Sequence, residues 1–290
     1  MTFKSLACAA ALLLPAGAWA GNTAAVLSAG SGAYLEAFSA FQAAYGSEVP
    51  HFDISREKPE LPAGIRTVIA FGAKAAGYPY PPGIRLVYCM APGFFLKAQP
   101  QQAKPVKISL VPDFSALLAK IRVIQPGIKK LLVFWMVPDF GRNIIEPLII
   151  EGARQGMQIS AVRLESSDDL PSVLRRKMGG MDAFWLPPDP LLITPENLMI
   201  LREFSWGNAI PFYGSTKGMT REGALASVGV SFSETGAAAA AAVLKLEAGE
   251  DLPNMIFPEK TEVTLNASAA KRCRVELPRE LIGEAAYLFP

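Results

Sequence analysis

Short apolar runs alternate with helix-like stretches along most of the chain. Four runs in the first third have the length and composition of buried strands: residues 24–27, 49–54, 67–71 and 85–89. Between the first two runs, Leu35, Phe38 and Phe41 recur at helical spacing and predict a helix. Strands that alternate with helices indicate βαβ units and a parallel sheet.

A stretch rich in Pro, Gln and Lys at residues 99–105 indicates a linker, and the alternation restarts after it. Asp113 and Thr194 are expected helix N-caps, and Pro195 suits the first helical position. The predicted strands of this part are residues 130–135, 158–164, 182–186, 210–213, 224–230 and 263–265. An alanine-rich helix at residues 236–249 is too short to span a bilayer, so it predicts close packing on a sheet.

Two α/β halves followed by a late helix and a late strand predict two Rossmann-like lobes with parallel sheets. The chain is expected to cross the hinge between them more than once. We assign residues 21–105 and 231–255 to the first lobe, and residues 106–230 and 260–290 to the second.

The first twenty residues have the features of a signal peptide. Lys4 precedes an apolar run at residues 6–14, and Ala18-Trp19-Ala20 is an A-x-A cleavage signal. A buried N-terminal helix is the alternative. Cys8 does not fit a lipoprotein site, because it comes before the apolar run is complete. The mature chain is therefore expected in the periplasm.

Composition excludes several classes of function. The 28 basic and 26 acidic residues are balanced and form no basic block, so nucleic acid is not an expected partner. The one histidine, His51, argues against a hydrolytic triad and a histidine metal site. Residues 30–32 lack the full dinucleotide fingerprint, and no P-loop is present. We expect no enzyme, no cofactor and no metal, and leave open whether Cys89 and Cys273 pair.

The second half resembles a known family. The sequence MDAFWLPPDP at residues 181–190 is similar to a strand and loop of the tryptophan/tyrosine-type ABC transporter substrate-binding proteins. Residues 196–204, 210–214, 221–226, 231–249 and 264–270 resemble further pieces of that family in the same order. The resemblance covers roughly residues 107–288. It implies a type I periplasmic-binding-protein fold that closes on a small solute, with amino acids among the family's ligands.

The first half departs from the family pattern at two strand ends. Residues 71–76, Phe-Gly-Ala-Lys-Ala-Ala, stand where the family often has G-T-P-A-A, and residues 89–92 replace an expected Asp-Pro. Both changes fall where a solute would be held, so the identity of the solute stays open.

Ligands of open α/β sheets lie beyond the carboxyl ends of the strands, beside helix N-termini. This rule and the resemblance together give eleven candidate ligand-binding residues: Ser28, Ser31, Gly72, Ala73, Lys74, Met90, Trp135, Asp189, Tyr213, Ser215 and Thr216.

Each polar or aromatic candidate also has a structural alternative. Lys74 would bind an anion or be a solvated surface lysine. Asp189 would pair with a ligand ammonium, as the resemblance implies, or serve as a turn residue between two prolines. Trp135 and Tyr213 would stack on a flat ligand or fill the core. Ser215 and Thr216 would donate hydrogen bonds or cap a turn.

These observations together predict a monomeric, exported receptor that binds a small organic solute, such as an amino acid or a carboxylate, for an ABC permease. The alternative is a periplasmic sensor or orphan binding protein of the same fold with no permease.

Overall fold

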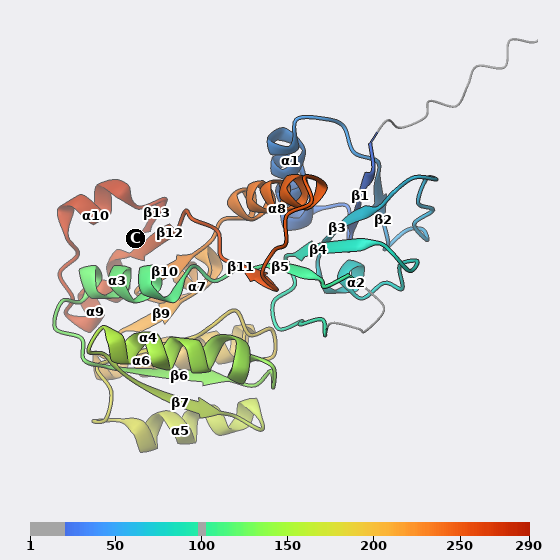
Figure 1. Ribbon diagram of the computed structural model, residues 1–290. Coiled ribbons are helices and arrows are strands. Elements are labelled where there is room, and N and C mark those ends of the chain that lie inside the picture. The colour runs from blue at the N-terminus through green and yellow to red at the C-terminus, as the bar shows by residue number, and fades with distance from the viewer. Residues whose placement is uncertain (1–20, 98–102) are drawn as a thin grey trace, which may run out of the picture.

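The computed structural model describes residues 21–97 and 103–290 and contains two separate sheets, each covered by helices (Figure 1). The predicted signal peptide, residues 1–20, lies outside the described residues, as do residues 98–102 of the predicted linker. We call the two sheets with their helices the first lobe and the second lobe.

The first lobe is built on six strands. They are β1 (Thr23–Leu27), β2 (His51–Asp53), β3 (Thr67–Phe71), β4 (Arg85–Cys89), β5 (Val106–Ile108) and β11 (Met255–Ile256). Their order across the sheet is β11-β5-β4-β3-β1-β2, and the pairs are parallel. The helices are α1 (Gly32–Tyr45), α2 (Ala73–Ala76) and α8 (Phe232–Glu247).

The second lobe is built on seven strands. They are β6 (Lys130–Trp135), β7 (Gln158–Arg163), β8 (Ala183–Trp185), β9 (Phe212–Gly214), β10 (Ala226–Gly229), β12 (Glu262–Asn266) and β13 (Tyr287–Phe289), in the order β13-β12-β10-β9-β8-β6-β7. Only β10 and β12 pair antiparallel among the described strands. The helices are α3 (Phe114–Ile124), α4 (Glu146–Arg154), α5 (Leu170–Lys177), α6 (Pro195–Asn208), α7 (Lys217–Arg221), α9 (Ala267–Cys273) and α10 (Arg279–Glu284).

Burial on both faces explains why the strands are apolar throughout. All residues of β1 and β3 are buried, as expected for parallel strands covered on two sides. Helices α1 and α8 pack on each other over one face of the first sheet. Gly236 of α8 lies directly against the backbone of α1, where any side chain would collide with the Ala37 carbonyl. The alanine-rich helix is therefore a close-packed cover, as predicted.

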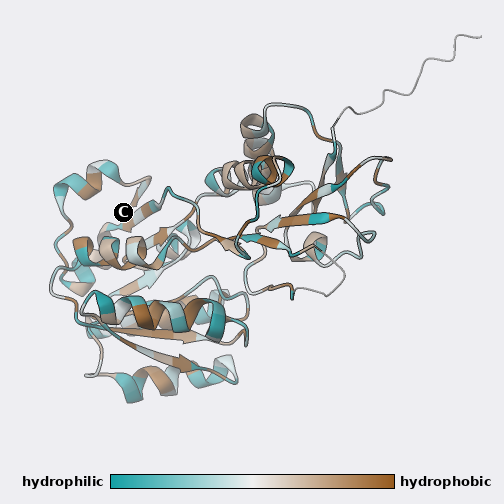
Figure 2. Ribbon diagram, in the orientation of Figure 1, coloured by the Kyte–Doolittle hydropathy of each residue, from teal (hydrophilic) through white to brown (hydrophobic). Residues whose placement is uncertain are grey.

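The second sheet is also covered on both faces. Helices α3, α4, α9 and α10 contribute to the core on one face, and α5, α6 and α7 to the core on the other. Figure 2 shows hydrophobic strands, whereas covering helices such as α4 and α5 carry hydrophilic and hydrophobic positions in turn. Amphipathic helices on a two-sided sheet give the predicted α/β architecture.

The chain passes between the lobes three times, after β5, after β10 and after β11. Figure 1 shows these segments side by side near β5 and β11, where they connect the two sheets. The predicted hinge with several crossovers is confirmed.

One detail of the fold corrects a prediction from the sequence, and a second answers a question that the sequence left open. β5 pairs with β4 and β11, so residues 106–108 belong to the first lobe and not, as predicted, to the second. The linker pattern ended just before this strand, which is too short to be distinguished from its surroundings by composition. Cys89 and Cys273 are free, buried thiols in the cores of different lobes, so they do not pair.

Candidate functional site

The first-lobe candidates form a tightly bonded turn cluster at the ends of β1 and β3. The Ser28 hydroxyl accepts a hydrogen bond from the Ala75 backbone N–H at 3.0 Å, within α2. Gly72 has a φ of 99°, and a side chain there would collide with Ser28 and Tyr34. Ala73 begins α2 and is partly buried. Glycine is therefore required at this turn by its backbone conformation.

Two other first-lobe candidates are exposed. Lys74 is exposed and donates to the Ile54 carbonyl at 3.2 Å, and Ser31 is the exposed N-cap residue of α1. Asp53, which the sequence argument did not select, holds the turn between β1 and α1, because its carboxylate accepts a hydrogen bond from the Gly30 N–H at 2.9 Å. Hydrogen bonds from Ser55 lower the pKa of this carboxyl group.

Met90 comes just before a first-lobe loop that contacts the second lobe. It is buried in the first-lobe core with a φ of 54°. Further along the loop, Gly93 lies against Val137 and Pro190 of the second lobe. The ring centre of Phe95 lies 6.0 Å from that of Phe140, edge to face. Residues 91–96 therefore form a contact between the lobes, which we call the seam loop.

A buried lysine supports the seam loop from below. Lys107 of β5 is 6% exposed and donates to the carbonyls of Ala91 at 3.0 Å and Phe94 at 2.7 Å. Burial lowers the pKa of Lys107 to about 7, and the negative charge of Asp139 in the second lobe opposes this shift.

Asp189 has a structural role in this conformation. It is 0% exposed, and its carboxylate accepts from the backbone N–H groups of Met136 at 2.6 Å, Val137 at 2.9 Å and Leu191 at 2.9 Å. These bonds fix the surface on which the seam loop rests. The expectation of a ligand ammonium at Asp189 is therefore replaced by the turn alternative, because no carboxylate surface faces solvent.

The two aromatic candidates pack in the second-lobe core. Tyr213 is fully buried and donates to the Gln125 side chain at 3.1 Å. Trp135 is partly buried against the same core, and its indole N–H finds no hydrogen-bond partner among the described residues. The stacking role expected for Tyr213 is excluded in this conformation by its burial.

Ser215 and Thr216 line a groove of about 670 Å³ beside the hinge. We call it the hinge groove. Its residues come from both lobes and from two crossover segments: Glu36, Leu110, Ser215, Thr216, Lys217, Gly218, Arg221, Ser227, Gly229, Val230, Ser231, Phe232, Glu262, Tyr287 and Phe289. Its volume falls in the range of roughly 300–1,000 Å³ typical of small-molecule sites.

The hinge groove combines hydroxyl groups with aromatic and charged side chains. Thr216 and Ser231 are N-caps of α7 and α8, and their hydroxyls accept from the backbone N–H groups of Met219 and Glu234. The Lys217 ammonium lies 4.2 Å from the centre of the Tyr287 ring. This mixture can hold a small solute that is partly polar and partly apolar.

Sequence reasoning missed the groove residues on β10, β12 and β13. Ser227 and Gly229 alternate with core residues of β10, so the period of two in this strand indicated a second face. The sequence could not predict that Tyr287 and Phe289 lie beside the groove, because their position depends on the pairing of β13 with β12 at the sheet edge.

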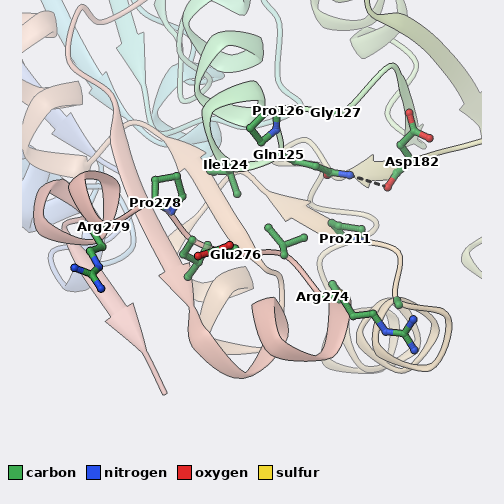
Figure 3. Close-up of a pocket in the computed structure, with 14 residues that line it drawn as sticks. Ile124, Gln125, Pro126, Gly127, Asp182, Pro211, Arg274, Glu276, Pro278 and Arg279 are labelled. Carbon is green, nitrogen blue, oxygen red and sulfur yellow. Dashed lines mark hydrogen bonds between the residues drawn. The ribbon is translucent and has the colours of Figure 1, made fainter.

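A second cavity of about 590 Å³ lies at the opposite end of the second lobe. Figure 3 shows Ile124, Pro126, Pro211 and Pro278 beside it, with Arg274, Glu276 and Arg279 around its margin. The Gln125 amide donates to the Asp182 carbonyl at 3.3 Å there. This cavity lies at the amino ends of β6, β8 and β9 and is lined by the second lobe only. Ligand sites of α/β sheets lie at the opposite, carboxyl ends of the strands.

No group of acidic, histidine and cysteine side chains suited to a metal ion occurs among residues 21–97 and 103–290. In the same part of the chain, none of the helices has the length and apolarity needed to cross a membrane.

Two α/β lobes with a hinge of three crossings and a groove beside it define the class of two-lobed periplasmic binding proteins. Residues 55–288 match the family described as ABC transporter substrate binding protein, and the chain belongs to this family. No curated protein matches the sequence.

Solved structures with the same fold share little sequence with this chain. A Clostridium difficile substrate-binding protein with adhesive properties, in its ligand-free open form, is 14% identical with a TM-score of 0.66 over 92% of this chain and 98% of that one. An ABC domain from Streptococcus pneumonia in complex with L-Trp is 13% identical, with a TM-score of 0.60 over 92% and 100%. A conserved domain protein from Vibrio cholerae is 14% identical, with a TM-score of 0.61 over 92% and 98%.

Proposed function

We propose that this chain binds a small organic solute in the hinge groove, without transforming it, and presents it to an ABC permease. The groove carries this proposal, because it is lined by both lobes and its volume of about 670 Å³ suits a small molecule. A solute there would contact α1 and the N-terminus of α8 on one side and α7 on the other.

The arrangement of the lobe contacts supports closure around this groove. The seam loop already rests on Val137 and Pro190, at the ends of β6 and β8. The hinge groove lies at the ends of β9 and β10. Rotation about the crossover segments would narrow the groove while the seam contact persists. A solute that binds both walls would favour the closed arrangement, since its affinity would differ between the two states.

An amino acid or a small carboxylate is the solute class that we favour. The groove offers the cations Lys217 and Arg221 as well as hydroxyl donors, which suit a carboxylate. The Streptococcus pneumonia neighbour was solved with L-Trp bound, which supports an amino acid as one member of this class.

We further propose that the chain acts outside the cytoplasm as a monomer and has no catalytic activity. Its family consists of substrate-binding proteins and not of enzymes. Lys4, the apolar run at residues 6–14 and the Ala18-Trp19-Ala20 motif support export and cleavage before Gly21. N-terminal sequencing of the exported protein tests this part: a chain that starts at Gly21 supports it, and an uncleaved chain contradicts it.

A thermal-shift screen of the chain from residue 21 against the common amino acids and small carboxylates tests the binding function. A solute at about one hundred times its Kd should stabilise the fold by about 2.7 kcal/mol and raise the melting temperature by a few degrees. If no compound stabilises the protein, the proposed solute class is wrong.

Two matched variants test the location. Gly218 of α7 lines the groove, and its nearest neighbour for an added side chain is Thr216 at 3.8 Å. Gly218→Phe should therefore fold and fill the groove, abolishing the ligand-induced shift. Gly283 of α10 has no neighbour within 4 Å, so Gly283→Phe is the control and should retain the shift. Full binding by Gly218→Phe would place the site elsewhere.

A further inference from the structure

We infer that one wall of the hinge groove, formed by Ser227 of β10 and Glu262 of β12, binds the cationic N–H end of the solute. This inference rests on the proposed function, because it assigns an orientation to a solute in that groove and, within the proposed class, favours an amino acid over a carboxylate that has no amine. Both residues line the groove, and neither was selected from the sequence.

The hydrogen-bonding direction at Ser227 follows from a chain of three buried hydroxyls. The Thr264 hydroxyl donates to the Thr220 hydroxyl at 2.8 Å, and the hydroxyls of Thr264 and Ser227 lie 2.6 Å apart. A threonine hydroxyl has one proton, and that of Thr264 is directed to Thr220. Ser227 must therefore donate its own proton to Thr264, which leaves only acceptor lone pairs on its oxygen.

Burial makes this acceptor selective. Ser227 is 2% exposed, so its oxygen lies at the bottom of the groove and not at the entrance. If a solute placed an acceptor beside the Ser227 oxygen, the two acceptors would face each other with no proton between them. Such unmatched polar contacts are unfavourable when they are buried, because neither group regains the hydrogen bond that it made with water. The base of the groove therefore favours a solute group that donates.

Glu262 adds negative charge beside this acceptor. In the antiparallel pair of β10 and β12, Ser227 lies opposite Thr264, and Gly229 lies opposite Glu262. The four positions share one face, because residues two apart in a strand point to the same side. Gly229 lacks a side chain, and one there would collide with the Ser215 carbonyl. Glu262 therefore has no side chain directly opposite it on β10.

No cation neutralises this carboxylate directly within the described part of the chain. The ion pairs found there join other residues, and Lys217 lies over the Tyr287 ring, 4.2 Å from its centre. Arg221 pairs with Glu222 at 3.3 Å. The Glu262 carboxylate can therefore pair with a cation supplied by the solute.

The opposite wall has the reverse polarity. The Thr216 hydroxyl accepts a capping hydrogen bond from a backbone N–H group of α7 and keeps its own proton to donate. Lys217 and Arg221 add positive charge on the same side, from α7. The groove therefore has acceptors on β10 and β12 and donors on α7, and Glu36 adds a second carboxylate from α1. A bound solute should place its amine toward β10 and β12.

Calorimetric titration with three matched probes tests this orientation on the chain from residue 21. The probes are 2-phenylethylamine, 3-phenylpropionate and L-phenylalanine, whose ring suits the aromatic surface of Phe232 and Phe289. We expect the two amines to bind at least tenfold more tightly than 3-phenylpropionate. Glu262→Gln, an exchange of equal size at a partly buried residue, should weaken both amines at least tenfold. Glu259→Gln, an exposed glutamate outside the groove, should change their affinity less than twofold.

Three results would overturn the inference. They are binding of 3-phenylpropionate as tight as that of the amines, unchanged amine affinity in Glu262→Gln, and no binding of either amine. If all three probes bind alike and Gly218→Phe abolishes their binding, the groove remains a solute site and only the assigned orientation fails.

Discussion

The Lys107 ammonium of the first lobe lies 3.7 Å from the centre of the Phe95 ring, directly beneath the seam loop. Phe95 in turn packs edge to face on Phe140 of the second lobe. One buried cation thus supports the loop through which the two lobes touch. This relationship links the protonation of a single lysine to the stability of the contact between the lobes.

Stability should depend on pH through Lys107. Burial lowers the pKa of Lys107 from 10.5 to about 7, so the unfolded chain binds this proton more tightly than the folded chain. Below about pH 7 both states are protonated, and the folded state carries the full cost of a buried charge. Above it only the unfolded state remains protonated, so the free energy of unfolding should rise, by about 1–2 kcal/mol between about pH 7 and pH 9.

Urea denaturation at several pH values measures this dependence. Because other groups titrate as well, the informative quantity is the difference from Lys107→Met, which keeps the length of the side chain without its charge. The variant should lack the rise, whereas Lys97→Met, at an exposed lysine of the same segment, should retain it. Parallel pH profiles for the wild type and Lys107→Met would contradict the prediction.

Asp189→Ala should destabilise the protein by about 3 kcal/mol or more. It would leave three backbone N–H groups without their acceptor, and each buried unsatisfied donor costs about 1–3 kcal/mol. Urea denaturation should show this loss, whereas Asp168→Ala, at an exposed aspartate, should change stability by only about 0.5 kcal/mol. Near wild-type stability of Asp189→Ala, together with lost solute binding, would restore the role of a ligand contact.

Asp189 also shows where sequence reasoning reached its limit. The strand-to-loop pattern around it placed it at the carboxyl end of β8. Whether its carboxylate faces solvent or backbone depends on the path of residues 136–137, which come from a distant part of the sequence. Local periodicity predicted the strands, most of the helices and the two-lobed architecture, because each of these depends on neighbouring residues.

Contacts between elements could not be predicted in the same way. The assignment of β5 to the first lobe depends on its pairing with β4 and β11, and the latter lies almost 150 residues further along the chain. The hinge groove likewise depends on the pairing of β12 with β10 and β13. Of the eleven candidate residues, Ser215 and Thr216 line this groove. Both residues lie just after the end of the strand that the sequence predicted at residues 210–213.

The thiols of Cys89 and Cys273 should react slowly in the native protein. Burial raises the pKa of both thiols, which leaves little of the reactive thiolate, and both side chains are buried, although Cys273 lines the cavity of the second lobe. A colour assay with an aromatic disulfide reagent should show fast reaction only after denaturation. A disulfide-linked species in a non-reducing mass spectrum would contradict the placement of the two cysteines in separate lobes.

Gly236→Ala should be strongly destabilising, although alanine is the better helix former. A side chain at Gly236 would collide with the Ala37 carbonyl and approach the Phe41 backbone nitrogen at 3.0 Å, so α8 would have to move away from α1. Overpacking of this kind typically costs about 1–3 kcal/mol. Gly283→Ala in α10 is the matched control, because an added methyl group there has no neighbour within 4 Å. It should stabilise the protein by up to about 1 kcal/mol through helix propensity alone. If thermal denaturation shows the same change for both variants, close packing of α8 against α1 is not what requires glycine at this position.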